Sequence, residues 1–186
     1  MTGRDLGHAL LTIARSAIGE RLGRARMSPA DHAALDQPSA TFVTLRNTGQ
    51  LRGCIGSLQA VRPLAVDVRE NAIAAAFRDP RFAPLSAKEF ESTSVEVSLL
   101  STPERVEVTE EEQLLVRLRP GVDGLILEYG RHRATFLPQV WEALAEPREF
   151  VRELKLKAGL PEGFWHAGVK VSRYAVTKWV DLDFAF

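Results

Sequence analysis

Cysteine is nearly absent from this sequence: there is one among 186 residues, Cys54. A single cysteine excludes an internal disulfide and any zinc or iron–sulfur site built from several cysteines. An excess of charge of one sign is absent too, because 24 lysines and arginines balance 24 aspartates and glutamates. A neutral chain lacks the basic surface of a general nucleic-acid binder, so we expect no nucleic-acid partner.

Long hydrophobic runs and the familiar metal and nucleotide motifs are missing as well. The apolar run within residues 1–24 is too short for a membrane span, and its charges are interleaved at helical spacing, unlike those of a signal peptide. The four histidines are scattered without His-x-His or HExxH spacing, and there is no GxGxxG or P-loop motif. We expect a cytoplasmic protein that makes no membrane contact and holds no metal.

The hydrophobic pattern alternates between helical and strand periods along the whole chain. Helices are expected at about 4–23, 63–79, 109–119 and 146–159, and strands at about 40–57, 94–101, 123–138 and 169–182. Two of the strand regions, 40–57 and 123–138, divide at a glycine and are expected to form hairpins. Hairpins with helices between them indicate an α+β fold with an antiparallel or mixed sheet.

The cysteine lies on the second strand of the first expected hairpin. Because side chains alternate along a strand, Arg52, Cys54 and Gly56 share one face and Gly53 lies on the other. One interpretation is a reactive thiol beside a guanidinium, with glycines that let a ligand approach closely. The other is a small buried residue beside glycines that admit a crossing helix.

The segment LRGCIGS (51–57) resembles the corresponding block of the AMMECR domain family, whose bacterial and archaeal members are called AmmeMemoRadiSam system protein A. Residues 41–82, TFVTLRNTGQLRGCIGSLQAVRPLAVDVRENAIAAAFRDPRF, are similar to the family's central block nearly throughout. Further blocks resemble the family in the same order across roughly residues 40 to 165: VEVSLLSTPERV, GLILEYGRHRATFLPQVW and LKLKAGLP. At Leu156 the family commonly has a second cysteine, so its absence here argues against a two-cysteine redox mechanism.

The resemblance implies a fold of two intertwined α+β lobes with antiparallel or mixed sheets and a groove between them, close to the Arg-Gly-Cys-Ile-Gly segment. A single domain of this kind would span 1–186, with a larger lobe of 1–102 plus 165–186 and a smaller lobe of 103–164. The name of the system implies a pathway shared with a Memo-type and a radical-SAM protein, which are the expected partners. It identifies neither the small-molecule ligand nor a cofactor.

Two residues are candidates for catalysis. Cys54 would be the nucleophile, and Glu96, within the family-like strand segment, would be its acid or base. Glu96 has a second interpretation, as the ion-pair partner of Arg52 or Arg81. His132 near the second hairpin is a weaker candidate base, and its alternative is a histidine of the turn.

The remaining candidates would bind a substrate or an anion. Arg52 and Arg81 carry guanidinium groups that grip carboxylate or phosphate, and Gln139 follows a proline that begins a helical turn. The alternatives are an ion pair that ends a helix at Asp79 and Arg81, and plain helix capping near Gln139. With Gly53 and Gly56 these residues complete the expected site.

Two functions follow from this set. The first is a cysteine-dependent group-transfer enzyme, or a subunit of one, that acts at the groove. The second is a non-catalytic adaptor that docks protein partners through the same groove around Cys54.

Overall fold

The computed structural model describes residues 3–183. The chain divides into two compact units, the first made of residues up to Leu100 together with those from Thr177 onward, the second of Ser101–Val176. Each unit combines helices with one sheet, and the pairings resolved in both sheets are antiparallel. The α+β fold expected from the sequence is therefore confirmed.

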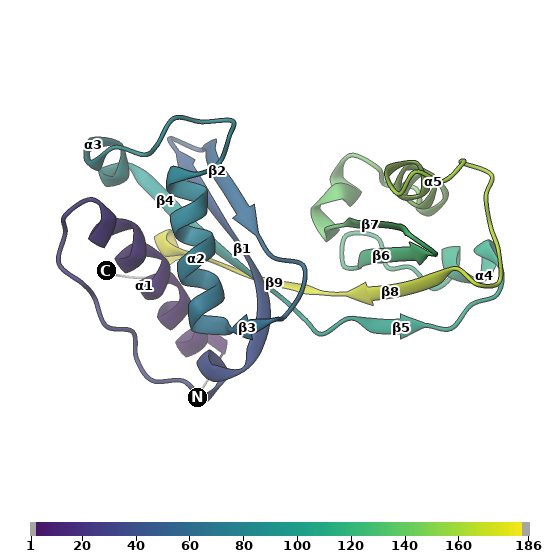
Figure 1. Ribbon diagram of the computed structural model, residues 1–186, viewed down its shortest axis with the longest axis horizontal. Helices are drawn as coiled ribbons and strands as arrows, with labels where there is room; N and C mark the ends of the chain where they lie inside the picture. Colours follow the sequence, from purple (N-terminus) through teal and green to yellow (C-terminus); the bar gives the residue numbers. More distant parts are fainter. Residues whose placement is uncertain (1–2, 184–186) are drawn as a thin grey trace. The chain divides into compact units, whose positions relative to one another are not determined.

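The first unit is built around a five-stranded sheet (Figure 1). Its strands are β1 (Pro38–Asn47), β2 (Gln50–Gly56), β3 (Arg62–Pro63), β4 (Thr93–Leu100) and β9 (Val176–Val180). The order is β2-β1-β4-β9, and β3 pairs with the start of β1. Strand β2 is thus at one edge of the sheet, two strands away from β4.

Helices cover one face of this sheet, as Figure 1 shows for α1 (Gly3–Arg21) and α2 (Leu64–Phe77). The unit also contains α3 (Ala87–Glu91) and the 3₁₀ turns η1 (Ala33–Asp36) and η3 (Asp181–Asp183). The core below the two long helices includes the following fully buried residues: Leu10, Ile18, Val43, Leu45, Val68, Val95 and Val97. Each such side chain contributes about 1.5–3 kcal/mol by leaving water. Since strand side chains alternate, Thr44 and Glu96 point to the opposite face of the sheet.

The second unit has a four-stranded sheet of its own, in the order β5-β8-β6-β7. Its strands are β5 (Glu104–Val106), β6 (Gly124–Tyr129), β7 (His132–Phe136) and β8 (Lys170–Tyr174), and its helical segments are α4 (Glu111–Leu115), η2 (Pro138–Glu142) and α5 (Pro147–Lys157). Trp141 and Phe150 stack in the core with their ring centroids 3.8 Å apart. Between α4 and α5, the ammonium of Lys155 is buried and lies 2.7 Å from Glu111 Oε2.

The last expected strand, 169–182, is two strands in the structure. It breaks at Ala175, so that β8 pairs in the second sheet and β9 in the first. The break is held by reciprocal bonds: the Ser101 amide donates to Ala175 O at 2.9 Å, and the Ala175 amide donates to Ser101 Oγ at 3.0 Å. Each half of the run pairs with different strands, which the hydrophobic pattern alone does not reveal.

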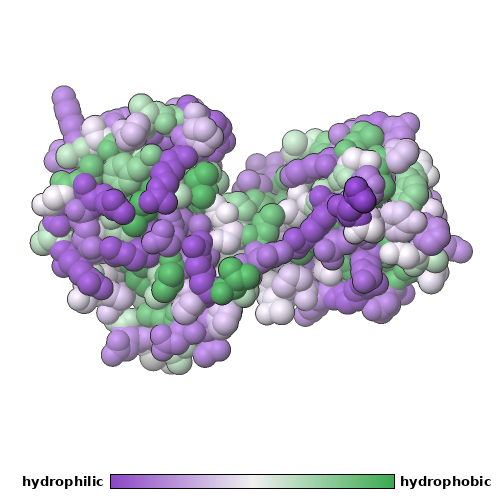
Figure 2. Space-filling view, in the orientation of Figure 1, coloured by the Kyte–Doolittle hydropathy of each residue, from purple (hydrophilic) through white to green (hydrophobic). Residues whose placement is uncertain are grey.

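The surface mixes polar and apolar residues. On the face seen in Figure 2, hydrophobic residues are interspersed with hydrophilic ones in both units. The two most exposed valines, Val61 and Val116, belong to different units. None of the helices within residues 3–183 is both long enough and apolar enough to cross a membrane.

Candidate functional site around Cys54

The hairpin that carries Cys54 is formed as the sequence predicts. Thr48 and Gly49 join β1 to β2 with φ values of 47° and 82°, the pair of positive values typical of a tight two-residue hairpin turn. The pairing places Cys54 opposite Thr44, but the register shifts between Leu45 and Arg46. The extra residue of this bulge is Arg52 on β2, which has no partner on β1, and the bulge interrupts the regular alternation of side chains there.

Both backbone groups of Cys54 point out of the sheet edge and are bound by one ion pair. Asp79 Oδ2 accepts from the Cys54 amide at 2.9 Å, and Arg81 Nη2 donates to Cys54 O at 3.3 Å. Arg81 also binds Asp79 through Nη2 at 2.7 Å and Nε at 2.9 Å. The Asp79–Arg81 pair therefore closes the edge of β2 at this point, where a free edge would otherwise expose unpaired backbone groups.

The electrostatics of this pair follow from its geometry. The guanidinium of Arg81, followed by the amides of Cys54 and Arg81, holds the pKa of Asp79 well below its ordinary value. Asp79 in turn raises the pKa of Arg81, and a smaller contribution in the same direction comes from the Cys54 thiol group. The side chain of Asp79 is 2% exposed and that of Arg81 is 53% exposed. Arg81 thus reaches solvent but is engaged with Asp79.

The thiol itself is half-buried and contacts a hydroxyl. Cys54 Sγ lies 3.3 Å from Thr44 Oγ1 on the neighbouring strand, and either atom can be the donor. Among the residues the structure describes, this hydroxyl is the hydrogen-bond partner of the thiol, and neither expected arginine is. Thr44 had no signal in the sequence, because it becomes a neighbour only through the register of β1 and β2.

The two glycines beside Cys54 make room for the protein itself. A Cβ on Gly53 would lie 2.1 Å from the carbonyl oxygen of Ala75 in α2, so the strand and the helix backbone meet closely here. A Cβ on Gly56 would lie 2.3 Å from the ring of Phe42. The interpretation that glycine admits a crossing helix therefore holds at Gly53.

Arg52 is held by an internal carboxylate. Its Nε donates to Glu89 Oε1 at 3.1 Å and its Nη2 to Ala83 O at 2.8 Å, and its side chain is 13% exposed. Arg52 and then the Ser86 amide lower the pKa of Glu89 to about 2. The Nη1 of Arg52 is buried without a partner among the described residues. The guanidinium is thus committed to the chain after α2.

Glu96 has a partner that the sequence did not identify. It lies opposite Thr44 in the pairing of β1 with β4, and Lys178 Nζ of β9 is 3.5 Å from its Oε2. Among the described residues, its ion pair is with Lys178 and not with Arg52 or Arg81, which pair with Glu89 and Asp79. The expected pairing of Glu96 with one of those arginines is therefore wrong. Cys54, Thr44, Glu96 and Lys178 come from four successive strands of one sheet.

The other candidates belong to the second unit. Gln139 is exposed in η2 and its side chain makes no hydrogen bond to any described residue. His132 Nδ1 lies 3.0 Å from Ala158 O at the end of α5, which gives this histidine a structural contact. Across residues 3–183, no three His, Cys, Asp or Glu side chains are grouped as metal ligands.

A buried carboxylate holds the chain that leaves β2. Asp67 is fully buried at the start of α2 and accepts from the Thr41 amide at 2.9 Å, Ser57 Oγ at 2.6 Å and Arg62 Nε at 2.8 Å. Asn71 Nδ2 donates to the same carboxylate at 2.9 Å and to Thr41 O at 3.0 Å. This network fixes the connection from β2 to α2, and therefore the position of the Cys54 edge against the helix.

The chain is similar to known proteins over most of its length. The family model described as AMMECR1 matches residues 11–179. A protein of Methanothermobacter thermautotrophicus is 41% identical over 180 residues, which cover 92% of each chain, and one of Thermofilum pendens is 39% identical over 194 residues, which cover 94% of this chain and 89% of the relative. The crystal structure of the uncharacterized protein PH0010 from Pyrococcus horikoshii is 34% identical, with a TM-score of 0.78, and the match covers 94% of this chain and 90% of that one.

Fold and site together define an α+β protein with two antiparallel sheets and one thiol near the edge of the larger sheet. The match spans most of the chain in both sequence and structure. The chain belongs to the AMMECR1 family.

Proposed function

We propose that the protein is a cysteine-dependent group-transfer enzyme, or the thiol-bearing subunit of one, in a pathway with Memo-type and radical-SAM proteins. The observation that carries the chemistry is the row Cys54–Thr44–Glu96, formed by register-matched residues of three adjacent strands. The named partners rest on the family resemblance alone.

The spacing of strands decides how a proton could move along this row. Adjacent strands lie about 4.7–4.9 Å apart, so Cys54 and Glu96, two strands apart, are separated by roughly 9–10 Å. That is too far for direct proton transfer, which needs about 2.6–3.2 Å. The hydroxyl of Thr44 lies between them and already contacts the thiol at 3.3 Å. Thr44 is therefore the residue that would relay the proton.

The proposed step balances without a cofactor. The sulfur of Cys54 forms a bond to an electrophilic carbon of a small molecule, and the leaving group departs with its electron pair. The thiol proton passes to Thr44 Oγ1 while the hydroxyl proton of Thr44 passes to the carboxylate of Glu96. An acceptor nucleophile then attacks the same carbon, and the C–S bond breaks with its electron pair going to sulfur. Glu96 returns its proton through Thr44 to restore the thiol, and the proton that the acceptor releases goes to the departed leaving group. Lys178 Nζ, 3.5 Å from Glu96 Oε2, is the ion-pair partner that would orient this carboxylate.

Alkylation kinetics test this proposal. The second-order rate of Cys54 with iodoacetamide is measured from pH 6 to 10 by intact mass in wild type, Thr44→Val and Glu96→Gln. At pH 7 the rate of both variants should fall by a factor of about ten or more, because Glu96 can no longer take the thiol proton through Thr44. Ser98→Ala, two residues from Glu96 on β4, is the matched control and should follow wild type. If the alkylation rates of all four proteins depend on pH in the same way, Thr44 does not relay a proton and the enzymatic proposal is wrong.

A second function is favoured by one observation, the engagement of both nearby arginines. Arg52 and Arg81 bind Glu89 and Asp79, so each guanidinium is already paired with a carboxylate of the protein. A non-catalytic adaptor that docks its partners through the surface around Cys54 does not need them. In that case Cys54→Ala should retain both partner binding and pathway function, whereas the enzymatic proposal requires that pathway function be lost.

A further inference from the structure

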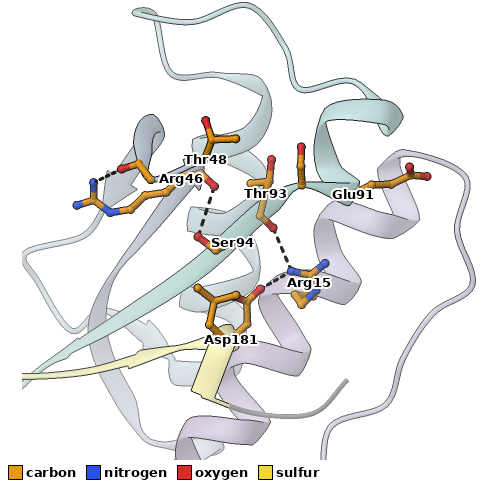
Figure 3. A pocket seen from close by; sticks show the side chains of 10 residues that line it. Arg15, Arg46, Thr48, Glu91, Thr93, Ser94 and Asp181 are labelled. Atoms are coloured by element: carbon orange, nitrogen blue, oxygen red, sulfur yellow. Dashed lines mark hydrogen bonds and ion pairs between the residues drawn. The ribbon is translucent and has the colours of Figure 1, made fainter.

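A polar pocket of about 540 Å³ opens in the first unit, where β4 begins and β9 ends (Figure 3). Its lining comes from α1, the end of β1 with the β1–β2 turn, α3 with the start of β4, and the segment after β9. The volume is within the range of pockets that hold small molecules. The lining includes the following hydroxyl-bearing residues: Thr48, Ser92, Thr93 and Ser94.

The pocket adjoins the row that contains Cys54 without including it. Arg46 and Ser94 are opposite each other in the pairing of β1 with β4, two residues along each strand from Thr44 and Glu96. Two residues of strand correspond to about 6.6 Å. A molecule in the pocket would therefore lie beside Glu96 on the same sheet, although its binding does not depend on the thiol.

The charges of the lining leave one guanidinium uncompensated. Arg15 pairs with Asp181, and Glu91 lies 3.3 Å from Arg24. Arg46 has no carboxylate partner among the described residues and donates one long bond of 3.4 Å to Gly49 O. Figure 3 shows this exposed side chain turned toward the hairpin turn. So weak a contact is readily exchanged for an anion, which a guanidinium binds through two parallel hydrogen bonds.

The same pocket has acceptors that lack donors. Asp181 is not among them, because Arg15 binds its Oδ2 and its Oδ1 is enclosed by the protein. The hydroxyls of Thr48 and Ser94 donate to Asn47 O and Arg46 O, so their oxygens keep free lone pairs. These acceptors suit a ligand that carries hydroxyl groups.

From the unpaired guanidinium and these hydroxyl acceptors we propose that the pocket binds a small hydroxylated anion, with the phosphate or carboxylate on Arg46 and the hydroxyls toward Thr48 and Ser94. An anion without hydroxyl groups on carbon would bind Arg46 but leave the hydroxyl acceptors unused. A neutral polyol would bind those acceptors but leave Arg46 without a counter-charge. The ligand class is therefore defined by the requirement for both groups in one molecule.

Nuclear magnetic resonance titration of the full chain tests this assignment with four probes: glycerol 3-phosphate, glycerate, inorganic phosphate and glycerol. Glycerol 3-phosphate or glycerate should shift the amide signals of Thr48, Gly49 and Ser92–Ser94, and should bind at least about tenfold more tightly than phosphate or glycerol. Arg46→Gln should weaken that binding about tenfold, since the charged contact is lost.

The control variant is Arg21→Gln, an exposed arginine at the end of α1 that does not line the pocket. It should bind as wild type does. The proposal is overturned if Arg46→Gln binds the probes as tightly as wild type, if the two hydroxylated anions bind no better than inorganic phosphate, or if the shifted amides lie elsewhere. The titration measures binding and not catalysis. A Cys54 thiol that proves unreactive would therefore leave this result unchanged.

Discussion

The amide nitrogen of Cys54 lies 2.9 Å from Asp79 Oδ2, across a gap of 25 residues in the chain. The carboxylate that receives this bond also binds Arg81, which returns a bond to the Cys54 carbonyl. The residue with the thiol is therefore positioned by its backbone, from the outer edge of the sheet, while its side chain contacts Thr44. Position and chemistry at Cys54 are set by different neighbours.

Replacing Asp79 with asparagine should destabilise the fold in a way that depends on pH. The variant loses charge-assisted bonds at a buried position, for an expected cost of about 1–3 kcal/mol at pH 7. The pKa of Asp79 is lowered in the folded state, so its stabilisation is complete above the unfolded value of about 3.9 and is lost as pH falls through the folded value. Urea unfolding of both proteins from pH 7 to pH 3 measures the difference.

That difference should stay constant between pH 7 and about 5 and shrink below pH 4. The matched control is Asp31→Asn, at an exposed position, which should change the free energy of unfolding little. A gap between wild type and Asp79→Asn that widens with acid would show that the sign of the argument is wrong.

Adding one methyl group at Gly53 should be severe. The new Cβ would lie 2.1 Å from the Ala75 carbonyl oxygen, and a backbone atom cannot move aside as the end of a side chain can. We expect Gly53→Ala to lose about 3 kcal/mol or more, measured by chemical denaturation. Gly163→Ala is the control, because a Cβ there meets nothing within 4 Å. If both variants have the same stability, the close approach of β2 and α2 is not real.

The buried ion pair of the second unit makes an asymmetric prediction. Lys155 is 2% exposed at its side chain and Glu111 is 19% exposed. Glu111→Gln leaves a buried ammonium without its counter-charge, for an expected loss of about 3–5 kcal/mol, whereas Lys155→Met replaces that charge with an apolar chain of similar length and should cost less. Thermal unfolding compares the two. Glu112→Gln breaks only an exposed pair with Arg148 and should cost at most about 1 kcal/mol.

Asp67→Asn should disrupt the connection between β2 and α2. The carboxylate accepts from four residues, and an amide in its place brings a donor to face other donors. The expected loss is about 3 kcal/mol, with faster hydrogen exchange at the Thr41 amide, since that amide is bonded to Asp67. Exposed Asp36 supplies the control substitution to asparagine. Unchanged exchange at Thr41 would mean that the amide has another acceptor.

Local patterns were sufficient to predict much of the fold. The turn at Asn47-Thr48-Gly49 was predicted because a two-residue hairpin needs positive φ, which Gly49 supplies. The helix that ends before Pro80 and the ion pair of Asp79 with Arg81 followed from residues adjacent in sequence. The break at Ala175 was missed, since the residues on both sides have the same strand pattern and differ only in the strands they meet.

The candidate site shows the same division between local and distant information. Placing Cys54 on the second strand needed only the hairpin, but the bulge at Arg52 and the contact with Thr44 depend on the register of two strands. The sequence left Glu96 as a base or as the ion-pair partner of Arg52 or Arg81, whereas its actual partner, Lys178, is 82 residues further along the chain. No pattern in one sequence reports such a contact.

The break at Ala175 also determines when the first sheet can be completed during synthesis. The strands β1, β2 and β4 are synthesised first, then all of Ser101–Val176, and only then most of β9. The second unit is continuous in the chain and can complete its sheet while the first still has an open edge along β4. About 76 residues are synthesised between β4 and most of β9. At 5–20 residues per second, the edge of β4 therefore stays unpaired for roughly 4–15 seconds. A nascent chain arrested before Val176 should therefore expose β4 to proteases and to other strands, and release from arrest should end that exposure.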